Sequence, residues 1–350
     1  MSDQRPASGW VKARSAASIG ALLALLAAAS YATVNALLRS VAADVDPFAG
    51  SLIRQLPLLV IACFALLILR PPALRPRSVE FIGAKWVTVL MVAGVISFLV
   101  GNVLLFSGLD WVGLAVATAA SQGGIVIGGT LISALVLREP PNRWQLVGVS
   151  IVAAGLAVVA SPGFGSVQAG FVAILGFLFS FGAGVCYTIS NAASRTVQRR
   201  PRTFITALAM TNFGGVIALV ITVAARSGGR FDLVYSALTP SQILVLVLAG
   251  TVNAVALASI TLAVRFTTVT AVSALSSMVI VFGIIIAWLV FHEEIAAAVI
   301  VGAAIIIVGV LVAQKRPAGP AALTPEPLLN FPNAINPTTD AFQAMEEGRK

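Results

Sequence analysis

The chain contains an internal repeat, and this repeat constrains its fold more than any other feature. The segment from Ser30 to Arg39 occurs again in related form from Cys186 to Arg195, 156 residues later. Further matches follow at a shift of 154 residues. The matched residues are Tyr31 with Tyr187, Asn35 with Asn191, Arg39 with Arg195, Glu139 with Glu293, Gly148 with Gly302, and Gly155 with Gly309. Such a duplication predicts a membrane bundle with a central site between two related halves.

The composition excludes an ordinary soluble protein. Of the 350 residues, 59% are hydrophobic and only 10% are charged, whereas soluble domains carry about 25% charged residues. Apolar stretches of about 20 residues, which can span a bilayer as helices, recur along nearly the whole chain. We therefore predict an all-α membrane protein with ten transmembrane helices. The expected spans are Ala16–Ser40, Pro47–Leu69, Lys85–Leu109, Gly113–Leu137, Trp144–Ala160, Ala169–Ser194, Thr203–Ala225, Ser241–Val264, Thr268–Phe291 and Ile295–Ala313.

These spans divide the chain into four segments. Residues 1–15 form an N-terminal cytoplasmic segment, residues 16–161 the first repeat, and residues 162–314 the second repeat. Residues 315–350 are rich in Pro, Asn, Thr and Glu, so we expect a disordered and mobile cytoplasmic tail. Cys63 and Cys186 both lie in apolar stretches, which argues against a disulfide, and the single His292 cannot form a metal cluster alone. We expect no metal and no cofactor, and a solvated loop around His292.

Basic residues predict the orientation of the chain. If the N-terminus is cytoplasmic, 18 of the 22 Lys and Arg residues lie in cytoplasmic segments, and only Arg39, Arg226 and Arg230 lie outside. This asymmetry follows the positive-inside rule and predicts a multi-pass protein of the bacterial inner membrane with both termini in the cytoplasm. The net charge of +9 then faces anionic lipid. The expected partners are the bilayer and a small-molecule substrate, without nucleic acid, and the chain is expected to be a monomer or homodimer.

The two repeats must be inverted relative to one another. Each holds five spans, and because five is odd, the second repeat enters the membrane from the opposite side. The charges agree, since Arg39 ends the first span outside whereas its match Arg195 ends the sixth span inside. Two halves related by an axis in the membrane plane can open a shared site to either side by the same motion. The repeat therefore favours a transporter that works by alternating access.

The segments that close each repeat carry a family resemblance. The first is Ala134–Glu139 followed by Gln145, Gly148 and Gly155, and the second is Ala287–Glu293 followed by Gly302 and Gly309, with Val299 at the position of Gln145. From about Ala16 to Ala313 the chain resembles the drug/metabolite transporter superfamily in its ten-helix form of two EamA repeats. The resemblance implies export or exchange of small metabolites, including amino acids, nucleobases and cationic drugs. It also implies a central cavity lined by helices one, three, four, six, eight and nine.

Polar residues within the spans are the candidates for substrate binding. Asn35 and Asn191, each on one helix face with a tyrosine, either line the cavity or bond neighbouring helices. The glycine pairs, including Gly124 with Gly128, are assigned to helix packing. The full set of candidates is Tyr31, Asn35, Arg54, Asn102, Ser121, Gln122, Tyr187, Asn191, Asn253, Ser276 and Ser277.

Arg54 is the one charged residue well inside a span, roughly 10 Å from its outer end. Its guanidinium either binds a substrate carboxylate or extends to the outer headgroups. No Asp or Glu lies clearly within a span, with Asp110 the nearest exception, which favours facilitated diffusion or exchange over proton coupling. We predict an exporter of apolar or aromatic amino acids. The alternatives are a proton-coupled multidrug or nucleobase exporter, a membrane-embedded enzyme, and a scaffold that does not transport; because titratable groups are scarce within the spans, we do not expect an enzyme.

Overall fold

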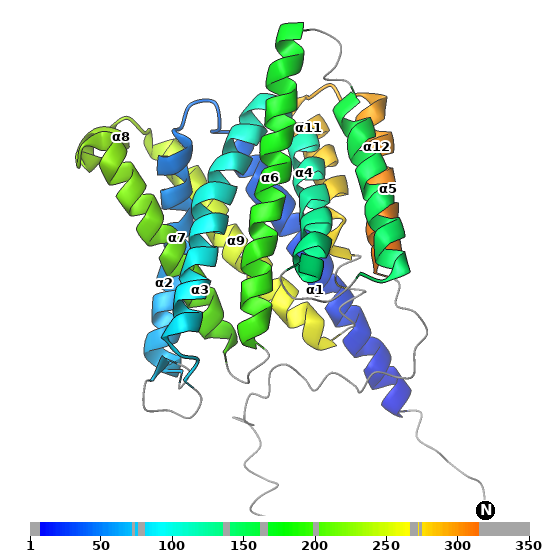
Figure 1. Cartoon of the computed structure of the whole chain (residues 1–350), viewed down its shortest axis with the longest axis horizontal. Helices are drawn as coiled ribbons and strands as arrows, with labels where there is room; N and C mark the ends of the chain where they lie inside the picture. The colour runs from blue at the N-terminus through cyan, green and yellow to red at the C-terminus, as the bar shows by residue number, and fades with distance from the viewer. Residues whose placement is uncertain are drawn as a thin grey trace, which may run out of the picture.

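The computed structural model describes residues 8–71, 74–75, 81–135, 141–161, 167–198, 203–266, 272 and 275–314. Helices dominate this part of the chain, and it contains no strand (Figure 1). The tail expected at 315–350 lies outside the described residues, as do residues 268–271 and 273–274 of the ninth expected span. The helices are α1 (Ser8–Arg39), α2 (Pro47–Leu69), α3 (Ala84–Gly94), η2 (Val95–Gly101), α4 (Asn102–Leu135), α5 (Arg143–Ala160), α6 (Val167–Gln198), α7 (Phe204–Ser227), α8 (Phe231–Ser236), α9 (Pro240–Phe266), α11 (Val279–Phe291) and α12 (Ala297–Ala313).

The described helices account for ten spans. Seven are apolar and long enough to cross a membrane, and one of these, Ala84–Leu135, has 52 residues and contains two spans. The shorter apolar helices α11 and α12 supply the last two. Helical structure satisfies every backbone group within a span, which a bilayer requires.

The expected break between the third and fourth spans is present at Gly113, but it is a kink and not a loop. The sequence placed a connection at residues 110–112, but α4 continues through them and is interrupted only at Gly113, whose φ of 74° and ψ of 177° are not helical. Glycine adopts this positive φ at little steric cost, so the chain changes direction there without a loop. In the ninth span a turn at Ser277 and Met278 precedes α11.

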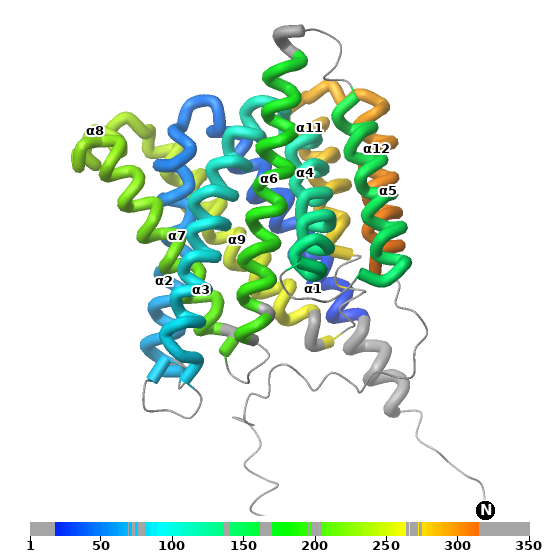
Figure 2. Tube along the Cα trace, in the orientation of Figure 1, coloured from blue at the N-terminus to red at the C-terminus, as the bar shows by residue number. Residues whose placement is uncertain are grey.

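Several helix pairs join one repeat to the other, and these pairs involve corresponding helices of the two repeats. The second helix of one repeat, α2, packs against α7, the second helix of the other, and the fifth helices α5 and α12 pack against each other. The pairing of α1 with α9 corresponds to that of α6 with α3 and η2. Figure 2 shows α2, α3 and α7 on one side and α5 with α12 on the other, with α4, α6 and α9 between them. This pairing is the arrangement expected of two inverted five-helix repeats.

Glycines bring the helix backbones close together. A Cβ at Gly155 of α5 would lie 2.9 Å from the Gly302 carbonyl oxygen of α12, and one at Gly309 would lie 2.8 Å from the Gly148 carbonyl oxygen. On α4, a Cβ at Gly124 would collide with the carbonyl oxygen of Phe181 on α6. The assignment of these glycines to packing is therefore confirmed, because small residues permit close approach where apolar burial cannot drive association.

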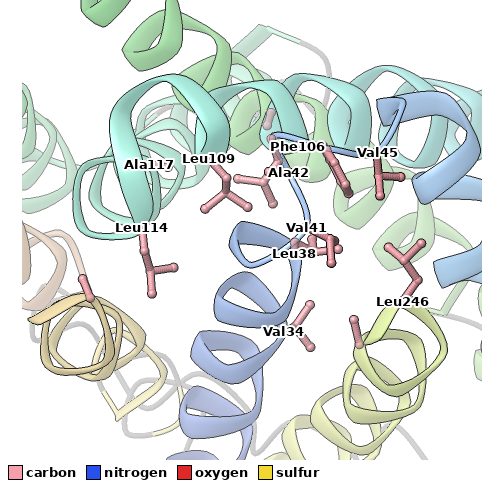
Figure 3. Packing of buried hydrophobic residues seen from close by; sticks show 14 of the residues in the cluster. Val34, Leu38, Val41, Ala42, Val45, Phe106, Leu109, Leu114, Ala117 and Leu246 are labelled. Atoms are coloured by element: carbon pink, nitrogen blue, oxygen red, sulfur yellow. The ribbon is translucent and has the colours of Figure 1, made fainter. Parts of the chain in front are cut away.

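One apolar cluster closes one end of the bundle. We call this the upper end, as drawn in Figure 1; there α1 ends and α2 begins. Leu38 of α1 and Leu109 and Leu114 of α4 are completely buried there, together with Leu246 of α9. Figure 3 shows these side chains converging from α1, α4 and α9, with Val41 of the α1–α2 connection beside them. The core thus separates the upper end from the middle of the bundle.

Candidate functional site

Arg54 lies buried in α2, with only 7% of its surface exposed. Helix α2 begins at Pro47, and the Asp46 side chain caps it by accepting hydrogen bonds from the backbone N–H groups of Phe48 and Ala49. The guanidinium does not extend to the end of the helix, because its Nη1 donates a 3.4 Å hydrogen bond to the Oδ1 of Asn102. Among the described residues no carboxylate forms an ion pair with it. A buried cation of this kind is costly unless it has a function or a partner.

Asn102 connects Arg54 to the second repeat. It is the first residue of α4, directly after the π-helix η2, a form that appears frequently at functional sites. Its Oδ1 accepts hydrogen bonds from Arg54 and from the phenol of Tyr187 on α6, the latter at 2.9 Å. The tyrosine hydroxyl also lies 3.4 Å from the Gly101 carbonyl oxygen. Three helices therefore meet through one side-chain oxygen.

The backbone around Tyr187 is positioned by close contacts with η2. The Ser97 hydroxyl donates a 2.9 Å hydrogen bond to the Cys186 carbonyl oxygen. A Cβ at Gly101 would lie 3.2 Å from the tyrosine ring, so a side chain there would require the ring to shift slightly. Tyr31 of α1 lies within electrostatic range of the same guanidinium. We call Tyr31, Arg54, Asn102 and Tyr187 the Arg54 cluster.

Two donors of the cluster lack acceptors. The Nε of Arg54 and the Nδ2 of Asn102 are both buried without a hydrogen-bond partner. An unsatisfied buried donor costs about 1–3 kcal/mol, and more when it is charged. Unpaired donors on a cation and an amide favour an anionic oxygen, and a carboxylate has the geometry that a guanidinium binds best.

The other predicted residues are distributed around this cluster. Asn35 donates a 3.4 Å hydrogen bond to the Thr118 hydroxyl of α4, which is the helix-bonding alternative for that residue. Asn191 is exposed, so the two repeat-related asparagines have different surroundings. The Ser121 hydroxyl donates to the Thr118 carbonyl oxygen of its own helix. Gln122 is half-buried, Asn253 and Ser277 are buried, and Ser276 is half-buried with an unpaired hydroxyl.

Sequence reasoning missed two arrangements. The Nδ2 of Asn212 on α7 donates a 3.2 Å hydrogen bond to the Oε1 of Gln55, an amide pair buried beside Arg54 along α2. The loop around His292 is not simply solvated, because the carboxylate of Glu293 bonds to both α1 and α4. The match between Glu293 and Glu139 in the repeat was the sequence feature that could have indicated this arrangement. Glu139 and the Arg195 side chain lie outside the described residues.

Metal ligands do not gather in the described part of the chain. No group of three or more His, Cys, Asp or Glu side chains comes together there. The site is instead a set of hydrogen-bonding groups held between apolar helices.

Comparison with known proteins gives the family. The model of the EamA-like transporter family matches residues 18–161 and again residues 174–314. The chain belongs to this family. Its members are transporters, so this EamA-like protein is a multi-pass membrane transporter with two family repeats. A search of curated proteins finds no significant match. Among solved structures, one titled "Crystal structure of protein" is similar in fold, with a TM-score of 0.53 and 17% identity over 85% of this chain and 96% of that chain.

Proposed function

We propose that this EamA-like transporter exports amino acids, particularly apolar or aromatic ones, and that Arg54 binds the substrate carboxylate. The supporting observation is the buried guanidinium, whose Nε has no acceptor and which has no carboxylate partner among the described residues. The substrate carboxylate accepts hydrogen bonds from this Nε and from the Nδ2 of Asn102. The apolar helices around the cluster accommodate the side chain of the substrate.

The proposed mechanism is alternating access by facilitated diffusion or exchange. The inverted repeats allow one site to face either side in turn. Within the described spans the carboxylate is that of Asp110 on α4. It lies three residues before the interruption at Gly113, near the upper end, and does not belong to the Arg54 cluster. No carboxylate in the cluster is available to carry a proton with the substrate. The distribution of basic residues supports a bacterial inner-membrane location with cytoplasmic termini.

Counterflow in liposomes tests the substrate. Purified protein is reconstituted with unlabelled phenylalanine inside, and labelled phenylalanine or leucine is added outside without a pH gradient. Accumulation of the labelled amino acid is expected, whereas phenethylamine, which lacks the carboxylate, is expected to compete at least tenfold less well. Equal competition by the amine would refute recognition of the carboxylate.

The Arg54 variants separate binding from folding. Arg54→Met removes a lone buried charge, so the melting temperature should hold or rise while counterflow falls about tenfold or more. Arg54→Lys keeps the charge but loses the planar fork, and should retain partial activity. Arg226→Met is the matched control, because Arg226 is 58% exposed and pairs with Asp46 near the upper end. Activity of Arg54→Met at the wild-type level would refute the proposed role.

The same liposomes distinguish the alternative functions. Uptake of organic cations or nucleobases, but not of amino acids, would favour a multidrug or nucleobase exporter. Flux that requires an imposed proton gradient would refute facilitated diffusion.

A further inference from the structure

The carboxylate of Glu293 joins three helices at the upper end. Glu293 follows α11, whose C-cap residue His292 has a left-handed conformation at φ 50°. Its Oε1 lies 3.3 Å from the Nε of Arg39, the last residue of α1. Its two oxygens also accept hydrogen bonds from the backbone N–H of Leu114, at 3.0 and 3.1 Å, and Oε2 accepts one from Ala115 at 3.5 Å.

The interruption of α4 makes this contact possible. Because Gly113 is not helical, Leu114 and Ala115 begin the second half of α4, and the first N–H groups of a helix have no carbonyl partner one turn earlier. A carboxylate is the preferred cap for such a helix start. A Cβ at Gly113 would lie 2.7 Å from the Glu293 carboxylate, so a side chain there would displace the carboxylate, and the φ of 74° also favours glycine. The cap comes from the other repeat, 179 residues away.

The contact lies at the closed end of the bundle. The Arg39 and Glu293 side chains are only 27% and 18% exposed. They line a hollow of about 250 Å³ together with Gly113, Val116 and Glu294. Beneath it, Leu38 and Leu114 belong to the buried cluster at the upper end. The helices α1, α4 and α11 cannot separate at this end unless the carboxylate releases at least two of its partners.

We propose that Glu293 is a positioning residue for transport, which holds the upper end closed by joining the end of α1 to the start of the second half of α4. This inference rests on the proposed alternating access. Release of Leu114 and Arg39 opens the path from the upper end toward the Arg54 cluster. The closure combines a cap and an ion pair, so an arginine at position 293 cannot replace it, because arginine accepts no hydrogen bond.

Thiol labelling in nanodiscs tests the closure without any substrate. In a background with Cys63 and Cys186 replaced by alanine, Ala117→Cys reports on the upper end, because Ala117 lies fully buried in its cluster. Glu293→Gln is expected to raise the labelling rate of this cysteine about tenfold, through loss of charge-assisted hydrogen bonds. The control reporter Ala207→Cys, buried in a separate cluster on α7, should be unaffected.

Three further variants exclude a merely structural effect. Arg39→Gln removes the ion pair but keeps the cap, and should raise labelling only about threefold. Glu294→Gln, which changes the neighbouring exposed carboxylate, should leave labelling unchanged. Arg39→Glu combined with Glu293→Arg should not restore closure.

Two outcomes would overturn the inference. One is unchanged labelling at position 117 in Glu293→Gln; if that variant does not fold, unchanged labelling in Arg39→Gln decides instead. The other is an equal rise at position 207, which would indicate general loosening of the bundle. Because labelling needs no substrate, failure of amino-acid counterflow would leave the closure standing, and failure of the closure would leave the substrate proposal standing.

Discussion

Asn102→Asp should stabilise this transporter and stop it from transporting. The change keeps the size of the side chain and keeps the Oδ1 that accepts from Arg54 and Tyr187. It replaces the unpaired Nδ2 donor with an oxygen and gives the buried guanidinium a carboxylate partner. The new carboxylate also removes the Nδ2 donor that we propose for the substrate and repels the carboxylate of the substrate.

The expected change in stability follows from the groups that are already buried in the wild-type protein. Removing the unsatisfied amide donor recovers about 1–3 kcal/mol. A hydrogen bond between two charged groups is about twice as strong as a neutral one, which adds roughly 1 kcal/mol. Against this stands the desolvation of the aspartate, several kcal/mol for an isolated ion. The attraction between the aspartate and the guanidinium, about 4 kcal/mol at an effective dielectric constant of about 20, offsets that desolvation. We therefore expect a net gain of about 1–2 kcal/mol and a rise in melting temperature of about 2–5 °C.

Thermal melting in detergent and counterflow in liposomes measure the two effects on one preparation. Asn212→Asp is the matched control, since Asn212 is completely buried and its hydrogen-bond partner is the uncharged Gln55. Among the described residues no cation bonds to Asn212, so a buried carboxylate there should lower the melting temperature. The pair of variants therefore differs in the sign of the stability change for the same chemical substitution.

Either of two results would refute the reasoning. If Asn102→Asp transports phenylalanine at the wild-type rate, the substrate carboxylate does not bind beside Arg54. If both aspartate variants lower the melting temperature equally, the guanidinium is not available to a new partner.

Two further predictions concern the helices around the site. Gly124→Ala should lower stability by at least about 1 kcal/mol, because the added Cβ collides with the Phe181 carbonyl oxygen, whereas Gly129→Ala, with only an ordinary 3.5 Å contact, should be tolerated; melting curves of both variants decide this. Asn35→Ala and Asn191→Ala should each reduce counterflow while expression stays normal, and loss of folded protein instead would assign them to packing.

Much of the fold could be predicted from the sequence because the relevant physics is local. A helix that crosses a bilayer needs only enough apolar residues, so the span of α2 from Pro47 to Leu69 was predicted at its observed ends. The path through Gly113 could not be predicted, because the same glycine fits a loop or a kink. Glu293 decides between them by capping the second half of the helix from a distant part of the chain.

The candidate site was predicted only as a set of residue types. The sequence identified Arg54 as a charge inside a span, but left open whether it extends to the headgroups. Its burial against Asn102 excludes that alternative. The repeat suggested equal roles for Asn35 and Asn191, but one bonds Thr118 and the other is exposed. Side chains related by the repeat meet different neighbours, because the sequences around them have diverged.

The sequence by itself determined that this chain is an apolar bundle of two inverted repeats. Hydropathy and length identify each span separately, and the odd number of spans in each repeat then fixes the inversion. Only the tertiary structure decided which polar groups share the interior. The bonds from Asn102 to Arg54 and Tyr187, and from Glu293 to Leu114, join residues 48, 85 and 179 positions apart. Such contacts depend on how whole helices pack, which no local pattern encodes.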